Sequence, residues 1–482
     1  MCSRRTWNRR QNGSWMARPT YKQLEAENQS LRRRVADLER QVEQLQAQVR
    51  QLTAQLQEVL RANKRQAAPF SKGPPKDPPA RPGRKAGESY GPKAHREIPR
   101  HKPDEVIDVP LPETCPDCGG TTTGDDVAHQ YQTEIPRRPI YRRFDIHIGH
   151  CRRCGRRIQP RHPLQTSDAL GAAASQLGAD AQAAIVHLNK SAGLSHGKIA
   201  DYFRTLFGIP LTPSGVCGVL LRAARRCEPL YQRILASVPH ASWIVPDETG
   251  WRIGGRLAWM HGLVTPSATV YHVDRRRGYE ATEPIIGERY CGTMIHDGWS
   301  PYDRFFFARH QQCLDHLRRR CKALLETAVA GAAVFPRQVR QLLLDALALR
   351  DRRDEGQLSS HGLAVAVGRL ESRLDRMLRW IKTHGDNERL AKHLAKHRHQ
   401  LFTFLKVPGI DATNYRAEQA MRPAAVNRKV WGGNRTAAGA HAQSVLMTVL
   451  RTTRQQLRDT LRFMTDILCG RRPRLPLLPA GP

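Results

Sequence analysis

A heptad repeat of apolar residues begins after Tyr21 and restricts the local fold more than any other feature of the chain. One core position holds leucine five times and then valine, and the other holds one asparagine followed by three valines and a leucine: Leu24, Leu31, Leu38, Leu45, Leu52 and Val59; Asn28, Val35, Val42, Val49 and Leu56. Such a seam favours a parallel coiled coil of two chains, and a lone asparagine at a core position fixes the register. We therefore predict a coiled coil over residues 21–63 and a homodimer. The alternative is a solitary amphipathic helix.

The charge of the chain indicates a polyanionic partner. The 482 residues carry a formal net charge of +34, spread over nearly the whole length. Such a field attracts nucleic acid by releasing its condensed counterions. The sequence has no apolar run long enough to span a bilayer and no lipidation signal. DNA is therefore the expected partner, and we expect no membrane association.

Two basic segments flank the heptads. Residues 1–20 form a basic extension without a secretory signal, and Met16, directly before the patterned segment, is an alternative start. Residues 64–105 are rich in Pro, Gly, Lys and Arg and poor in apolar residues, which predicts a disordered basic linker. Eleven cysteines, an odd number, are more typical of free thiols and metal ligands than of a disulfide framework, so we expect a reducing compartment.

Two Cys-x-x-Cys motifs, CPDCGG and CRRCGRR, lie within residues 106–162. Their four thiolates suit tetrahedral zinc: Cys115, Cys118, Cys151 and Cys154. The segment between the pairs alternates as strands do, which predicts a zinc ribbon with a structural Zn²⁺ ion. The alternative is four unligated cysteines. His147 and His150 are possible substitute ligands, although four cysteines already complete the set.

Residues 163–240 have a helical pattern. Two helical stretches surround a turn with Gly208 and Pro210, and Thr212 or Ser214 can cap the second helix. This arrangement is compatible with a helix-turn-helix whose second helix enters the major groove of DNA. An ordinary helical hairpin fits the spacing at least as well.

The pattern changes to strands over residues 241–318. ASWIVPDETGWRI, RLAWMHGLVTP and ATVYHVDRRRG predict three consecutive strands; a helix over 279–286 follows, and GTMIHDGW predicts a fourth strand. This order suits a ribonuclease-H-like α/β sheet. Asp247 falls at the end of the first strand and Asp297 at the end of the fourth, and adjacent parallel strands would bring the two carboxylates together. Like charges so close require a cation, and two Mg²⁺ ions suit phosphoryl transfer.

A third carboxylate follows a helix-rich insertion over residues 319–408. TNYRAEQAMRP predicts a helix that Thr413 or Asn414 can cap and that presents Glu418 on its second turn. Glu418 would be the third metal ligand. Basic residues on this helix would hold DNA phosphates: Arg416, Arg422, Arg428 and Lys429.

The expected architecture is therefore multidomain α/β. It comprises an N-terminal coiled coil, a zinc ribbon, a helical DNA-binding region and a ribonuclease-H-like catalytic domain with a helical insertion. The last part of the catalytic domain, over residues 409–470, contains the glutamate helix, and a tail over residues 471–482 follows.

Taken together, the motifs resemble those of bacterial transposases of the IS66 insertion-sequence family, which have an Asp-Asp-Glu triad. The likeness covers nearly the whole chain: the heptads, CPDCGG with CRRCG, DETGWRIGG, HDGWSPYDRF, CLDHLRRR and NYRAEQAMRPAAVNRK. Carried over position by position, it implies that Asp247, Asp297 and Glu418 are the catalytic triad, with a helical insertion before the glutamate. The segment KVWGGNRTAAGA departs from the family's aromatic-rich W-x-F pattern.

The resemblance implies a DNA transposase of the bacterial cytoplasm, associated with the nucleoid. Water activated by Mg²⁺ would cut the transposon end, and the freed 3′-hydroxyl would attack target DNA. We assign Asp247 to bridging two Mg²⁺ ions, for which Mn²⁺ can substitute, and Asp297 and Glu418 to one ion each. Accessory proteins of the same element are possible partners. The alternatives are a DNA-binding regulator with an inactive transposase fold, and a nuclease of the same fold that cuts without joining.

Some neighbouring residues have plainer explanations. Asp303 and Glu248 are rival carboxylates, but Glu248 should point to the opposite face of its strand from Asp247. Cys313 and His316, one helical turn apart, are too few to hold a metal well, so we expect a packed helix contact. Two tryptophans could stack on a flipped base, although core packing is the more common role: Trp299 and Trp431.

Overall fold

The computed structural model describes residues 21–64, 98–124, 126–133, 135–328, 330–379, 382 and 384–477. The chain divides into two compact units, Met1–Asp125 and Asp126–Pro482, and each is described by itself. The expected extension over residues 1–20 lies outside the described residues, as do most of the expected linker and the end of the expected tail. Among the helices described, none combines the length and apolarity that crossing a membrane requires.

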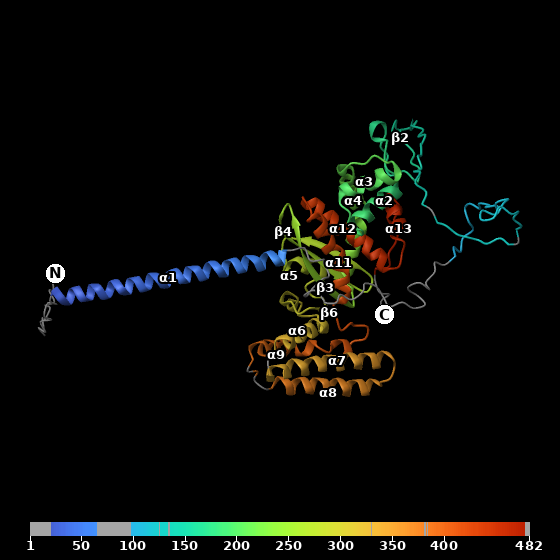
Figure 1. Ribbon diagram of the computed structural model, residues 1–482. Coiled ribbons are helices and arrows are strands. Elements are labelled where there is room, and N and C mark those ends of the chain that lie inside the picture. The colour runs from blue at the N-terminus through green and yellow to red at the C-terminus, as the bar shows by residue number, and fades with distance from the viewer. Residues whose placement is uncertain are drawn as a thin grey trace, which may run out of the picture. The chain divides into compact units, whose positions relative to one another are not determined.

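The long helix α1 (Tyr21–Lys64) contains the heptads (Figure 1). Its described leucine and valine side chains at the core positions are exposed, from 49 % at Leu24 to 64 % at Leu52. The side chains of Leu56 and Val59 lie outside the described part. A single chain thus forms the helix but leaves the seam open to solvent, and its pairing with a second chain stays a prediction.

The first cysteine pair closes a tight turn in the first unit. The Cys115 N–H donates to the Gly120 carbonyl at 2.8 Å, and the Gly119 N–H donates back to the Cys115 carbonyl at 2.9 Å. Gly119 has φ of +74°, a left-handed conformation that glycine adopts without steric cost. The glycine after the motif is therefore part of the turn.

The second cysteine pair closes the same kind of turn in the second unit. It connects β1 (Gly149–His150) to β2 (Arg157–Ile158), which pair antiparallel. The Cys151 N–H donates to the Arg156 carbonyl and the Gly155 N–H to the Cys151 carbonyl, both at 2.8 Å, and Gly155 has φ of +68°. Both motifs thus present their thiols from matching turns.

The strands expected between the two cysteine pairs are mostly absent. Apart from β1, described residues 126–133 and 135–148 contain no strand. The apolar side chains there are exposed, such as Ile135 at 76 % and Tyr141 at 82 %. Alternation specifies a strand only where a partner strand and a buried face exist, and this segment has neither among the described residues.

Three helices follow in the second unit: α2 (Ala179–Lys190), α3 (His196–Phe207) and α4 (Pro213–Ser237). The α3 helix ends at Gly208 in the left-handed conformation, and the Thr212 hydroxyl accepts the Gly215 N–H at 3.0 Å to cap α4. The expected helices and the Thr212 cap are confirmed. Because α4 is buried along one face from Val216 to Ile234, it is a central core helix, and entry into a DNA groove stays a prediction.

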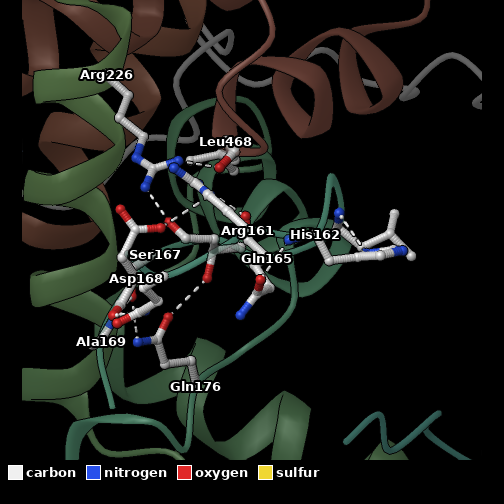
Figure 2. Close-up of polar contacts among 12 residues, drawn as sticks. Arg161, His162, Gln165, Ser167, Asp168, Ala169, Gln176, Arg226 and Leu468 are labelled. Atoms are coloured by element: carbon white, nitrogen blue, oxygen red, sulfur yellow. Dashed lines mark hydrogen bonds and ion pairs between the residues drawn. The ribbon is translucent and has the colours of Figure 1, made fainter. Parts of the chain in front are cut away.

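A polar network anchors the segment after β2 to these helices (Figure 2). The Arg226 guanidinium on α4 donates to the Thr166 carbonyl and to the Leu468 carbonyl at the end of the last helix. The Thr166 hydroxyl donates to Gln176 Oε1 at 2.9 Å, and Gln176 Nε2 donates to Ser167 Oγ at 2.6 Å. One half-buried arginine thus holds together three segments distant in sequence.

A five-stranded sheet forms the centre of the second unit, in the order β5-β4-β3-β6-β7. β3, β4 and β5 pair antiparallel with one another in chain order, whereas β6 runs parallel to both β3 and β7. The elements are β3 (Trp243–Ile253), β4 (Arg256–Val264), β5 (Thr269–Asp274), α5 (Tyr279–Ile286), β6 (Thr293–His296) and β7 (Arg309–Gln312). The four expected strands and the helix between them are confirmed. The edge strand β7 was not predicted, because RHQQ is short and polar.

Helices cover both faces of the sheet. On one face, Ile244, Leu263 and Met294 pack with α2, α3, α4, α12 (Ala437–Gln455) and α13 (Thr460–Leu468). On the other, Val245 and Ile295 pack with α6 (Leu314–Thr327), α7 (Val334–Asp354), α8 (Ser360–Leu378), α9 (Gly385–Lys396), α10 (Thr403–Lys406) and α11 (Tyr415–Trp431). Neighbouring strand residues therefore belong to different cores, as strand alternation requires.

The segment expected to be a helical insertion contains most of α6 and all of α7 to α10 (Figure 1). The α7 helix packs against both α6 and α8. Short 3₁₀ turns complete the second unit: η1 (Gly171–Ala173), η2 (Val238–His240), η3 (Ser300–Arg304), η4 (Ala330–Ala333) and η5 (Arg398–Gln400).

The open edge of β5 is covered by hydroxyl groups of α12. Backbone N–H groups of three alternate strand residues donate to three hydroxyls four residues apart: Thr269 to Thr452 at 3.2 Å, Tyr271 to Thr448 at 2.8 Å and Val273 to Ser444 at 3.1 Å. Two residues along a strand span about 6.8 Å and four residues along a helix about 6 Å, so the spacing of the N–H donors on β5 matches the spacing of the hydroxyl acceptors on α12. The helix thus satisfies an edge that could otherwise pair with another strand.

Candidate active site

Asp247 and Asp297 lie at the same level on adjacent strands. In the parallel pairing of β3 with β6, Trp243 is opposite Thr293 and Ile244 is opposite Met294. The same offset carries Asp247 to Asp297, which directly follows β6. Neighbouring strands are about 4.8 Å apart, so this register brings the two residues close together. Asp247 is in the middle of β3 rather than at its end as expected, because β3 continues along β4 to Ile253.

The two aspartates also share a face of the sheet. Val245 and Ile295, each two residues before an aspartate, both belong to the core beneath α11. Because side chains alternate along a strand, Asp247 and Asp297 project to that same side. The α11 helix packs on β3 and β4 and carries Glu418 over this face. Three segments far apart in sequence therefore converge here.

Electrostatic repulsion accompanies this convergence. Asp247 is partly buried, and burial together with the charges of Glu248, Asp297 and Glu418 raises its pKa to about 7. Its carboxylate accepts the Glu248 N–H at 2.9 Å, which opposes the rise. In the described part of the chain no cationic side chain pairs with Asp247. An approaching cation would therefore relieve the repulsion and favour the charged form.

Glu418 is held by α6 in this structure. The carboxylate accepts Arg319 Nη2 at 3.0 Å and lies 3.7 Å from His316 Nε2, while Arg319 also donates to Asp315 at 2.7 Å. Glu418 lies on the first turn of α11, not the second, because the helix begins only at Tyr415. The N-terminal residue Asn414 makes no side-chain capping bond, contrary to one of the two expected caps.

Glu248 occupies the opposite face, as predicted, and its charge is compensated. Its side chain is only 7 % exposed. Arg277 donates to Oε1 at 2.9 Å and 3.2 Å, and the Tyr302 hydroxyl donates to Oε2 at 2.9 Å. Burial raises the pKa of Glu248, and these hydrogen bonds act against the rise. The other rival carboxylate, Asp303, pairs with Lys396 of α9 at 2.8 Å.

The loop after Asp297 is tightly packed. The Trp299 N–H donates to Asp297 Oδ1 at 3.0 Å. Gly298 has φ of +91°, and a Cβ atom there would lie 2.5 Å from Gln312 Oε1 and 3.2 Å from His393 Cε1. Only glycine fits without a shift of these neighbours, so the insertion helix α9 helps to determine the path of the loop that carries Asp297.

Both tryptophans considered for base stacking have intramolecular partners. The Arg277 guanidinium lies 4.4 Å from the Trp299 ring centroid, and Tyr302 lies edge-on to the same ring at 5.6 Å. Trp431 packs edge-on against Trp251 at 5.8 Å, and its Nε1 donates to the Gly193 carbonyl at 3.2 Å. These contacts favour the packing role for each.

The four basic residues expected to bind DNA have different surroundings. Arg416 pairs with Asp411 at 2.5 Å and is half exposed, whereas Arg428 turns inward and donates to the Gly250 carbonyl of β3 at 2.5 Å. Lys429 is exposed. Arg422 lines an open cleft of about 340 Å³ with a second arginine, Arg451 of α12; the other lining residues are Ser191, Gln419, Pro423, Val426 and Asn427. DNA contact by all four stays a prediction.

Cys313 packs into the core at the start of α6, whereas His316, one turn later, lies beside Glu418. Cys313 is buried, and its N–H donates to the His296 carbonyl of β6 at 2.7 Å. Burial raises the pKa of its thiol. Across the described ranges, no three His, Cys, Asp or Glu side chains stand close enough together to enclose a metal ion. In this structure Glu418 is paired with Arg319 instead.

Several site residues escaped the sequence analysis. Arg277 and Tyr302 donate hydrogen bonds to Glu248, Arg319 binds Glu418, and Arg451 lines the cleft beside Arg422. Arg277, Tyr302 and Arg319 lie 29 to 99 residues from the carboxylates that they contact. Arg451 lies on a different helix from Arg422. The only signal was the density of arginine in DRRRG and CLDHLRRR, which does not specify a partner.

Comparison with known proteins identifies the family of the chain. No curated protein matches the chain. The family model described as Transposase IS66 family matches residues 174–442. The matched region contains the whole sheet, Asp247, Asp297 and Glu418, and it spans more than half of the sequence. Members of this family are DNA-processing enzymes. The chain therefore belongs to the IS66 family of transposases.

Proposed function

We propose that this chain cleaves the ends of a DNA transposon and joins them to target DNA by metal-dependent phosphoryl transfer, with Asp247, Asp297 and Glu418 as the catalytic carboxylates. The observation that carries the proposal is the register of β3 and β6, which puts the two aspartates at one level and on one face. The α11 helix packs on that face and carries Glu418. These are the three positions that the family resemblance implies.

The sheet supports a ribonuclease-H-like classification. Three antiparallel strands are followed by two parallel ones, in the order β5-β4-β3-β6-β7. Asp247 lies on the central strand β3 and Asp297 directly follows its neighbour β6, where helices cover both faces. We propose that the catalytic domain has the ribonuclease-H-like fold with a helical insertion over residues 319–408, before the glutamate helix.

The donor set suits magnesium. Three carboxylates, one with a pKa raised to about 7 by burial and by its neighbours, provide the hard oxygen ligands that Mg²⁺ prefers. When bound, such ions activate water or a 3′-hydroxyl and stabilise the charge that develops on the phosphate. Asp247 would lose its proton as the ion binds. Glu418 would exchange Arg319 for the metal, and Arg319 would keep its second partner, Asp315.

The cleft beside α11 supports a path for DNA. Arg422 is four residues after Glu418, or about 6 Å along the helix axis, and it shares the cleft with Arg451. Two guanidinium groups can bind phosphate oxygens strongly. We propose that a strand engaged at the carboxylates continues across this cleft. Replacing Arg451 by alanine should weaken DNA binding and reduce its salt dependence by about one ion.

The N-terminal motifs support dimerisation and zinc binding. The exposed seam of α1 has the heptad pattern of a parallel two-stranded coil, and we propose that a second copy covers it. In each cysteine turn, backbone N–H groups directed at the first sulfur lower its thiol pKa: Asp117 and Cys118 at Cys115, and Cys154 and Arg153 at Cys151. Thiolate is the form that binds zinc, so a structural Zn²⁺ ion stays our proposal for the four cysteines.

The decisive experiment is Mg²⁺-dependent cleavage of DNA carrying the element's own ends, in the presence of any accessory proteins of the element. Glu418→Gln should abolish cleavage and preserve DNA binding, whereas the surface variant Asp386→Asn should behave as the wild type. Cleavage that survives Glu418→Gln would refute the triad. Binding without cleavage by the wild type would favour a regulator, and cutting without strand transfer would favour a nuclease.

A further inference from the structure

We propose that Arg277 is a positioning residue that ties the Asp297 loop to β3 and so sets the separation of the two aspartate carboxylates. The proposal rests on the proposed metal-dependent function of these aspartates. Arg277 itself lies on the opposite face of the sheet and would touch neither metal nor DNA at the carboxylates.

Arg277 bridges three segments. Its guanidinium carbon lies 4.4 Å from the ring centroid of Trp259 on β4 and 4.4 Å from that of Trp299 in the loop after β6. Its Nη2 and Nε donate to Glu248 of β3 at 2.9 Å and 3.2 Å. A planar guanidinium can stack flat against aromatic rings while it donates hydrogen bonds from its edge, a geometry that the tetrahedral ammonium lacks.

The residues that Arg277 holds are the ones that orient the aspartates. The Glu248 N–H donates to Asp247 Oδ1 at 2.9 Å, and the Trp299 N–H donates to Asp297 Oδ1 at 3.0 Å. The side chains of these same two residues contact Arg277. A displacement of Glu248 or Trp299 would therefore move the N–H group that holds one aspartate and change the separation of the two aspartate carboxylates.

The backbone makes such a tie necessary. Within the described part of the chain, β3 and β6 pair at Trp243 with Thr293 and at Ile244 with Met294 but not beyond, so this ladder stops three residues before the aspartates. Glu248 is fixed from its second oxygen by Tyr302, a buried side chain. Arg277 and its partners thus form a side-chain connection at the level where the backbone connection has ended.

The test measures Mn²⁺ binding to the full-length protein by electron paramagnetic resonance, beside the Mg²⁺ dependence of cleavage. Arg277→Met and Glu248→Gln should each weaken Mn²⁺ binding about tenfold, as removal of groups that orient metal ligands does, and shift the Mg²⁺ dependence equally. Arg277→Lys should fall between these and the wild type, because it keeps the charge but not the stacking. DNA binding should not change.

Arg276→Met is the matched control. Arg276 is in the same loop and forms a double hydrogen bond with Asp274 at 3.1 Å, but it contacts neither Glu248 nor Trp299 in the described structure. It should bind Mn²⁺ as the wild type does. If Arg277→Met fails to fold by circular dichroism, Glu248→Gln, which preserves shape, decides the question.

Wild-type Mn²⁺ affinity in both Arg277→Met and Glu248→Gln would overturn the inference while leaving the proposed function intact. Failure of the proposed function has a different signature. In that case the wild type would show no Mn²⁺ binding that Asp247→Asn removes, and the positioning role would fall with it.

Discussion

Asp247 and Glu248 are adjacent on one strand, yet the two faces of the sheet surround their carboxylates very differently. Glu248 receives hydrogen bonds from Arg277 and Tyr302 on both oxygens. Asp247 receives one backbone N–H and lies near two further carboxylates. A compensated carboxylate stabilises the fold, whereas an uncompensated one remains available for an external cation. The difference favours Asp247 over Glu248 as a metal ligand in the proposed reaction.

The largest expected effect is the loss of cleavage in Asp247→Asn. The change preserves size but removes the charge that would bind metal, so we expect a rate reduced about a thousandfold or more, equivalent to about 4 kcal/mol in the barrier. Cleavage of labelled transposon ends measures it. A fall of less than tenfold, with folding intact, would place the metal elsewhere.

Glu248→Ala should act mainly on stability, besides the weaker Mn²⁺ binding expected for loss of the Glu248 carboxylate. It leaves the buried Tyr302 hydroxyl and the half-exposed Arg277 without their partner, and breaking such a pair costs about 2–3 kcal/mol after allowance for the exposure of Arg277. Urea unfolding monitored by circular dichroism measures the loss. An unchanged unfolding midpoint would contradict the structural role of Glu248.

Lys190 extends the comparison to a buried cation. It is 5 % exposed; its ammonium contacts Gln443 and lies 5.5 Å from the Trp431 ring centroid, and burial lowers its pKa to about 7. Between pH 7 and about 10 the unfolded chain therefore binds a proton that the folded chain does not. The wild type should gain about 1.4 kcal/mol of stability per pH unit relative to Lys190→Met over this range. Urea unfolding of both proteins at several pH values tests it. A difference in free energy of unfolding that stays constant with pH would refute it.

Asp247 should give a pH dependence of stability with the opposite sign when a chelator removes divalent metal ions. Its folded pKa of about 7 lies above the ordinary value of 3.8, so the folded chain holds the extra proton and stability falls as pH rises from about 4 to 7. The melting-temperature advantage of Asp247→Asn over the wild type should grow across this interval and then level off. An advantage that does not change with pH would mean that the carboxylate is compensated after all.

The smallest expected effect concerns a neutral hydrogen bond at the edge of the same sheet. Thr448→Val keeps the shape of the side chain but removes the hydroxyl that accepts the Tyr271 N–H at 2.8 Å. We expect a loss of about 1 kcal/mol. Cleavage should be unaffected, which separates edge stability from the carboxylate site. A loss above that of Glu248→Ala would reverse the proposed ranking.

Local patterns in the sequence predicted most of the central sheet. Alternation identified β3, β4, β5 and β6, and the 279–286 helix agreed with α5. The same rule failed between the cysteine pairs, where the alternating apolar residues are exposed and form no strand. It also missed β7, whose residues Gln311 and Gln312 are polar but fully buried. Gln311 is retained inside because its amide bonds to Leu401 and Phe404 of the insertion.

By itself, the sequence determined the helical heptad segment, the two cysteine turns and four of the five strands of the central sheet, because each depends on neighbours within a few residues. It singled out Asp247, Asp297 and Glu418, but the tertiary structure decided that Asp247 lies in the middle of β3 and Glu418 on the first turn of α11. Only the tertiary structure decided which charges are compensated. Arg277 reaches Glu248 across 29 residues and Arg319 reaches Glu418 across 99. In a chain with 78 lysines and arginines, composition offers many possible partners for every acid, and packing alone selects among them.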